Sequence, residues 1–177
     1  MSNPHSSHAD SITARAAAIR LLVLDVDGVL TDGRLYFNAE GEALKAFHVR
    51  DGAGIVQLLK AGIQVAIISG RNSLAVNTRM NELGVLHVRQ GIQDKQAALL
   101  DLLKMLQINA DCIACMGDDT PDIPMFRMAH LAVAVADAHP AARAAAHYVT
   151  QFAGGTGAVR EVCDLILQAQ SVRRSGN

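Results

Sequence analysis

Short apolar runs alternate along this chain with segments of helical periodicity, and this alternation limits the possible folds more than any other feature. Apolar residues recur at helical spacing over residues 11–19, 52–61, 73–83, 94–106 and 157–169. Between these segments lie runs too short for helices, at residues 20–26, 64–69, 85–88, 112–117, 131–135 and 148–149. Strands that are apolar on both faces are typical of a parallel sheet covered by helices. The sequence therefore predicts an α/β fold, a three-layer Rossmann-like parallel sheet.

One segment, residues 33–50, interrupts this alternation, because it is too polar and too rich in glycine for a helix. Residues 35–37 and 43–47 read as two strands around Asn-Ala-Glu-Gly, which predicts a β-hairpin insertion after the first strand. A lone hairpin is marginally stable in water. Four of its large apolar side chains would stay partly exposed on a monomer: Leu35, Phe37, Leu44 and Phe47. We therefore expect hairpins of several chains to pack together in a homo-oligomer.

Length and composition limit the number of domains in the chain and the classes of partner that it can bind. A length of 177 residues favours a single domain, which we place at residues 11–170, after a mobile lead-in (1–10) and before a flexible tail (171–177). A net charge of −1 and 3% aromatic residues argue against nucleic acid as a partner. No apolar run approaches the roughly 20 residues of a membrane helix, and no signal-peptide pattern opens the chain, so we expect a cytoplasmic protein with no membrane partner. We interpret Cys112 and Cys115 as buried strand residues.

Polar motifs follow four of the predicted strands, and in a parallel sheet they converge at one edge. They are Asp-Val-Asp-Gly at residues 25–28, Ser-Gly-Arg at 69–71, Lys95, and Gly-Asp-Asp-Thr-Pro-Asp at 117–122. Asp25, Asp27 and Asp118 offer the oxygen ligands that Mg²⁺ prefers. Ser69 and Lys95 supply donors suited to phosphoryl oxygens. The set predicts phosphoryl transfer, with Asp25 as the nucleophile and Asp27 as the acid and base.

The order of these motifs resembles that of phosphatases of the haloacid dehalogenase superfamily. Four longer segments, at residues 25–33, 41–52, 135–140 and 154–165, resemble one family within it, the 3-deoxy-D-manno-octulosonate 8-phosphate phosphatases. This resemblance implies a capless, Mg²⁺-dependent homotetramer that hydrolyses a small sugar-acid phosphate in the cytoplasm, for lipopolysaccharide biosynthesis. Two alternatives stay open: a phosphatase for a related nine-carbon keto-sugar acid phosphate, and a non-catalytic domain that binds sugar phosphates.

The same resemblance implies a role for each matching residue. It makes Asp25 the nucleophile and Asp27 the acid/base, and it places the metal between Asp25, the backbone carbonyl of Asp27 and Asp118. Ser69 and Lys95 would hold the phosphate.

Further residues would surround this centre. Asp119 and Asp122 are expected in or near the shell just outside the metal ligands. Four residues would line the phosphate and substrate mouth: Gly28, Gly70, Arg71 and Arg50. The two arginines among them are candidates for the sugar-acid carboxylate, with a surface arginine as the alternative for each.

Overall fold

The computed structural model describes residues 4–175, with side chains described for residues 11–172. Its main sheet has six parallel strands in the order β5-β4-β1-β6-β7-β8, which confirms the predicted α/β fold. The strands are β1 (Leu21–Leu24), β4 (Gln64–Ile68), β5 (His87–Arg89), β6 (Ile113–Gly117), β7 (Leu131–Ala134) and β8 (Tyr148–Val149).

The central strands are buried on both faces, as their uninterrupted apolar sequences require. All four residues of β1 are fully buried, and Val23 lies in register with Ala66 of β4 and Cys115 of β6. The prediction of a buried strand cysteine is confirmed for Cys115. It is wrong for Cys112, which is half-buried and ends a short 3-10 helix, Ala110–Cys112, just before β6.

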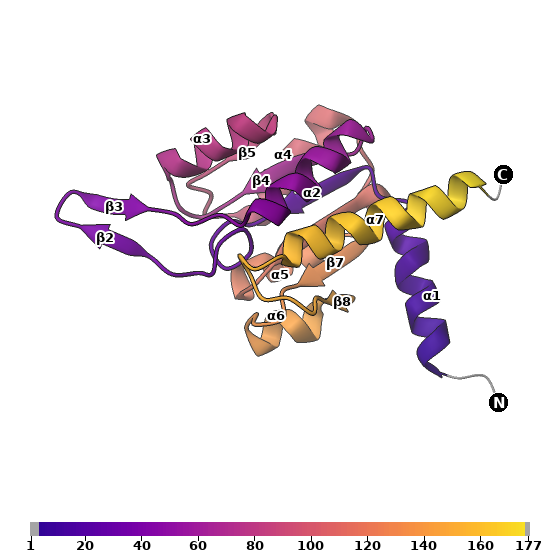
Figure 1. Ribbon diagram of the computed structural model, residues 1–177. Coiled ribbons are helices and arrows are strands. Elements are labelled where there is room, and N and C mark those ends of the chain that lie inside the picture. The colour runs from indigo at the N-terminus through magenta and orange to yellow at the C-terminus, as the bar shows by residue number, and fades with distance from the viewer. Residues whose placement is uncertain (1–3, 176–177) are drawn as a thin grey trace.

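Helices cover both faces of the sheet. One face carries α1 (Pro4–Ala17), α2 (Val49–Lys60), α3 (Leu74–Leu83) and α7 (Ala158–Ser175), and the other carries α4 (Lys95–Leu106), α5 (Ile123–Phe126) and α6 (Pro140–Ala145). Figure 1 shows α7 side by side with α2, and α7 also contacts α1. Within the described residues, no helix is both long and apolar enough to span a bilayer.

Local signals account for some of the helix boundaries. Asp94 caps α4, its carboxylate accepting the backbone N–H of Ala97 at 2.9 Å, and Gly84 ends α3 with a φ of 78°. Helix α1 begins at Pro4, inside the expected lead-in, and α7 continues to Ser175, inside the expected tail. Residues 1–3 and 176–177 of those two segments lie outside the described chain.

Asp51 is of a residue type that often caps helices, but it lies inside the first turn of α2, which begins after His48. Its carboxylate instead accepts the backbone N–H of Arg160 at 2.8 Å, in the first turn of α7. Asp51 therefore joins two helices that are far apart in the sequence.

The predicted hairpin is present as β2 (Tyr36–Asn38) and β3 (Gly41–Leu44), which project from one end of the molecule in Figure 1. The second strand ends at Leu44 rather than at residue 47, because Phe47 turns inward and packs against the core. Phe37 and Leu44 remain 59% and 52% exposed. The hairpin thus carries an apolar surface that no other described residue of the chain covers.

Candidate active site

The sheet has a topological switch point between β1 and β6. The chain passes from β1 to β4 and β5 on one side and then returns to β6 on the other, so loops diverge at the carboxyl ends of these two strands. Asp25 and Asp118 follow these strand ends. A cavity of about 500 Å³ opens there, lined by Asp25, Asp27, Gly33, Ser69, Gly70, Arg71, Ile92, Gln93, Lys95, Asp118, Asp119, Pro121 and Asp122.

Three carboxylates and one ammonium form the centre of this cavity. Asp25, Asp118 and Asp122 each place an oxygen within 4.8 Å of the others. Lys95 Nζ lies 3.0 Å from Asp25 Oδ2 and 2.6 Å from Asp122 Oδ1. The buried Asp122 also accepts the backbone N–H groups of Asp118 and Asp119, at 3.0 and 3.2 Å. Asp122 therefore holds Lys95 and the loop after β6 in place.

The electrostatics of the cluster suit a hard cation. Burial, together with the charge of Asp122, raises the pKa of Asp25 to about 6. Burial, followed by repulsion from Asp25 and Asp122, raises the pKa of Asp118 to about 7. One buried oxygen of Asp25, Oδ1, has no hydrogen-bond partner among the described residues. Surplus negative charge and an unpartnered carboxylate oxygen are features that a bound Mg²⁺ satisfies, so these residues fit the metal.

These pKa shifts give the metal-free protein a defined dependence of stability on pH. A carboxyl whose pKa is higher in the folded chain stabilises the fold while protonated, and this stabilisation is lost as the pH rises through the folded value. We expect the variant Asp118→Asn to exceed the metal-free wild type in melting temperature by less at pH 5 than at pH 8, because Asp118 of the wild type ionises above about pH 4 in the unfolded chain but only near pH 7 in the folded chain. At pH 8 it should exceed the wild type by at least roughly 2–4 °C, the shift that about 1 kcal/mol produces in a domain of this size. Thermal unfolding in chelator measures the difference, with Asp101→Asn on the exposed face of α4 as the control. A difference in melting temperature that stays the same from pH 5 to pH 8 would contradict the burial of Asp118 beside Asp25 and Asp122.

The hairpin supplies a cation that the sequence analysis missed. Lys45, just after β3, is almost fully buried; its Nζ forms an ion pair with Asp27 Oδ1 and lies 3.2 Å from Glu42 Oε2. Arg71 Nε lies 3.8 Å from the second oxygen of Asp27, and its guanidinium lies 5.8 Å from the ring of Phe37. The spacing Gly-x-x-x-Lys-x-Phe was visible in the sequence, but only the folded hairpin reveals that its lysine contacts Asp27.

The loop that carries Asp27 is packed against a second glycine-containing loop. Gly28 has a φ of 84°, and a Cβ there would overlap the carboxylate of Asp118. From the far end of the chain, Gly155 donates its N–H to the carbonyl of Val29 at 2.9 Å. A Cβ on Gly154 would overlap the carbonyl oxygen of Gly28. The segment 153–157 therefore packs directly against the loop that carries Asp27, which we call the catalytic loop.

We expect Gly154→Ala to displace residues 28–31, because the carbonyl of Gly28 is rigid backbone and cannot yield as a side chain would. The kcat should fall roughly tenfold or more, as expected when a reacting group is shifted by a fraction of an ångström. Gly62→Ala is the control: its φ of 82° makes alanine strained, but a Cβ there meets nothing within 4 Å. It should lower the melting temperature while leaving kcat intact. Equal kcat values for both variants would contradict the supporting role of Gly154.

The structure brings together most of the residues predicted for the site. Ser69, Gly70, Arg71 and Asp119 line the cavity with the acidic cluster. Arg50 does not: it lines a separate cavity between α2 and α7. A single chain therefore presents only one of the two candidate arginines, Arg71, to the catalytic cavity.

A parallel sheet with an aspartate cluster and a lysine at its switch point defines the class of haloacid dehalogenase-like hydrolases. Residues 86–162 match the family model of that description. The chain is 53% identical over 162 residues to the 3-deoxy-D-manno-octulosonate 8-phosphate phosphatase of Yersinia pestis, an alignment that covers 92% of this chain and 87% of that protein. The chain belongs to the family of 3-deoxy-D-manno-octulosonate 8-phosphate phosphatases.

Solved structures agree with this assignment. The crystal structure of the Yersinia pestis enzyme matches with a TM-score of 0.90 at 52% identity, covering 92% of this chain and 88% of that one. The enzyme of Moraxella catarrhalis, solved in complex with a magnesium ion, a phosphate ion and a KDO molecule, matches with a TM-score of 0.90 at 44% identity, covering 94% and 95% of the two chains.

Proposed function

We propose that this protein hydrolyses 3-deoxy-D-manno-octulosonate 8-phosphate to 3-deoxy-D-manno-octulosonate and phosphate in the cytoplasm, through an aspartyl-phosphate intermediate. The observation that carries the proposal is the buried carboxylate of Asp25 in the cavity lining, which has one oxygen on Lys95 and the other without a hydrogen-bond partner among the described residues. An unpartnered, desolvated oxygen beside a fixed cation is suited to nucleophilic attack.

In the first step, Asp25 attacks phosphorus and the bond from phosphorus to the sugar oxygen breaks. Lys95 keeps Asp25 ionised, since its own pKa, which burial would lower, is raised by Asp25 and Asp122. Mg²⁺ would be held by Asp25, Asp118 and the backbone carbonyl of Asp27, and it supplies charge neutralisation at the phosphoryl oxygens. Ser69, which is buried and lines the cavity, would donate to the same oxygens.

Asp27 acts as the acid and then as the base. It gives its proton to the departing sugar oxygen, and in the second step it takes a proton from the water that attacks the aspartyl-phosphate. Phosphate leaves, and Asp25 is restored as a carboxylate. Lys45 and Arg71 lie on either side of Asp27 and fix its orientation at the cavity mouth. Arg71, half-exposed there, would bind the carboxylate of the sugar acid.

A steady-state comparison of substrates tests this function. We expect kcat/KM for 3-deoxy-D-manno-octulosonate 8-phosphate to exceed that for p-nitrophenyl phosphate by at least roughly 10²-fold, because only the sugar acid offers a carboxylate to Arg71. The variant Arg71→Gln should reduce this preference more than it reduces turnover of p-nitrophenyl phosphate. A higher kcat/KM for a nine-carbon keto-sugar acid phosphate would reassign the substrate. No turnover of any phosphomonoester with Mg²⁺ would favour a sugar-phosphate-binding domain.

The exposed hairpin predicts assembly. Leu35, Phe37 and Leu44 stay exposed on one chain, and burying such side chains contributes roughly 1.5–3 kcal/mol each. We therefore propose a homo-oligomer, most simply a tetramer, in which hairpins of neighbouring chains pack together and wall each site. Light scattering should show the oligomer at assay concentration, and deletion of residues 38–41 should weaken assembly and sugar-acid binding. A fully active monomer would contradict the proposal.

A further inference from the structure

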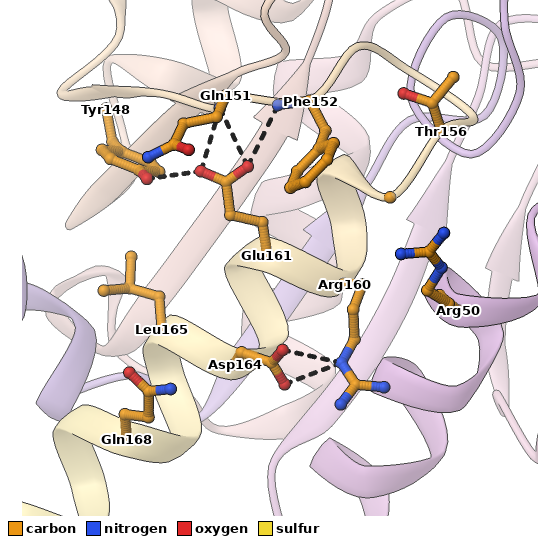
Figure 2. A pocket seen from close by; sticks show the side chains of 11 residues that line it. Arg50, Tyr148, Gln151, Phe152, Thr156, Arg160, Glu161, Asp164, Leu165 and Gln168 are labelled. Carbon is orange, nitrogen blue, oxygen red and sulfur yellow. Dashed lines mark hydrogen bonds and ion pairs between the residues drawn. The ribbon is translucent and has the colours of Figure 1, made fainter.

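A second cavity, of about 540 Å³, lies between α2, α7 and the loop that joins β8 to α7 (Figure 2). It is lined by Arg50, Tyr148, Gln151, Phe152, Thr156, Gly157, Arg160, Glu161, Asp164, Leu165 and Gln168. Its volume falls in the range of small-molecule sites. None of these residues lines the catalytic cavity.

The two carboxylates of this cavity are already occupied by donors from the protein. Glu161 accepts the hydroxyl of Tyr148 at 2.6 Å and the backbone N–H groups of Gln151 and Phe152, at 2.9 and 3.3 Å. Both oxygens of Asp164 accept from Arg160 Nε, at 2.8 and 2.9 Å, as the dashed lines in Figure 2 show. Neither acid is left to bind an incoming cation.

The two arginines of the cavity, in contrast, have N–H donors that make no hydrogen bond within the described residues. Arg160 uses only Nε, so its two terminal nitrogens make no hydrogen bond within the described chain. Arg50, which approaches from the facing helix α2, makes no side-chain hydrogen bond there either. Guanidinium groups match carboxylates in geometry and in charge. This end of the cavity is therefore suited to a carboxylate.

The rest of the lining suits a hydroxylated carbon chain. The amides of Gln151 and Gln168 can each donate and accept, and the hydroxyl of Thr156, which donates to the carbonyl of Ala153 at 2.7 Å, still has lone pairs to accept. Phe152 and Leu165 supply apolar surface for the C–H groups. We propose that this cavity is a second binding site, separate from the catalytic one, for a small polyhydroxy carboxylate.

The cavity lies beside a loop that packs against the catalytic loop, so a ligand bound there can stabilise the catalytic loop. The loop that contributes Phe152, Thr156 and Gly157 to the cavity packs through Gly154 and Gly155 against residues 28–32. A ligand that bridges this loop to α2 and α7 would hold it against the catalytic loop. Binding should therefore raise the melting temperature of the whole domain.

Calorimetric titration of the metal-free full-length protein with D-gluconate tests the proposal. We expect gluconate to bind and sorbitol, which has the hydroxyl groups but no carboxylate, to bind at least about tenfold more weakly. Arg160→Gln and, separately, Arg50→Gln should each weaken gluconate binding by about tenfold or more. Arg143→Gln, which removes the same charge from an exposed position on α6 outside both cavities, should leave the affinity unchanged.

Four results would overturn the second site. They are no gluconate binding at millimolar concentration, equal binding of sorbitol, an equal loss of affinity in Arg143→Gln, and displacement of gluconate by phosphate with Mg²⁺. The last would place gluconate in the catalytic cavity instead. Circular dichroism of each variant verifies folding, and the two arginine variants test the site independently because they alter different helices.

Discussion

Replacing Asp25 with asparagine is expected to abolish turnover, lowering kcat by at least about 10⁴-fold. An amide oxygen carries no full negative charge, so it attacks phosphorus poorly and is a weaker ligand for Mg²⁺. The fold should survive, because Asp25 already experiences repulsion from Asp122 and a neutral side chain relieves it. Phosphate release measures the loss, and circular dichroism verifies the fold.

A matched substitution outside the cavity shows whether activity is lost because the nucleophile is removed or because one negative charge is removed. Asp101→Asn makes the same substitution on the exposed side of α4, outside the catalytic cavity, and should retain full activity. Rapid quenching followed by mass spectrometry should place the phosphoryl group on Asp25 in the wild type and on no residue in Asp25→Asn. A phosphorylated residue other than Asp25 would refute the mechanism.

Removal of the metal should have an effect of similar size. Asp25, Asp118 and Asp122 cluster within 4.8 Å of one another, and without a metal ion this surplus of carboxylates repels the dianionic phosphate that the cavity must bind. Excess chelator should therefore eliminate activity, and Mg²⁺ should restore it. Full activity in chelator, with no metal detected by elemental analysis, would contradict the metal site.

Much of this architecture could be predicted from local sequence. Strands buried on both faces leave few alternatives to a parallel sheet, and in such a sheet motifs that follow strands must converge. The convergence of Asp25, Lys95 and Asp118 was therefore predictable from the order of strands and motifs alone. Asp94 caps the start of α4 and Gly84 ends α3, both by interactions within a few residues, so their roles were also predictable.

Residues that act across long stretches of sequence were not predictable in this way. Asp51 resembles a local helix cap, yet its partner is the backbone of Arg160, which only the packing of α2 against α7 brings near. Lys45 reaches Asp27 because of how the hairpin folds back, and no local spacing encodes that contact. Arg50 was assigned to the substrate from the family resemblance and the affinity of arginine for carboxylates, whereas its helix places it in the second cavity.

The contact between Gly154 and Gly28 has a consequence for synthesis on the ribosome. Every acidic residue of the catalytic cavity precedes the loop that supports Gly28, so a nascent chain carries all its catalytic groups before it can arrange them. The supporting loop and α7, which also packs on α1, are translated after all of these residues. Such contacts close slowly, because the intervening chain must first be ordered. Phosphatase activity should therefore first appear only after α7 has been translated.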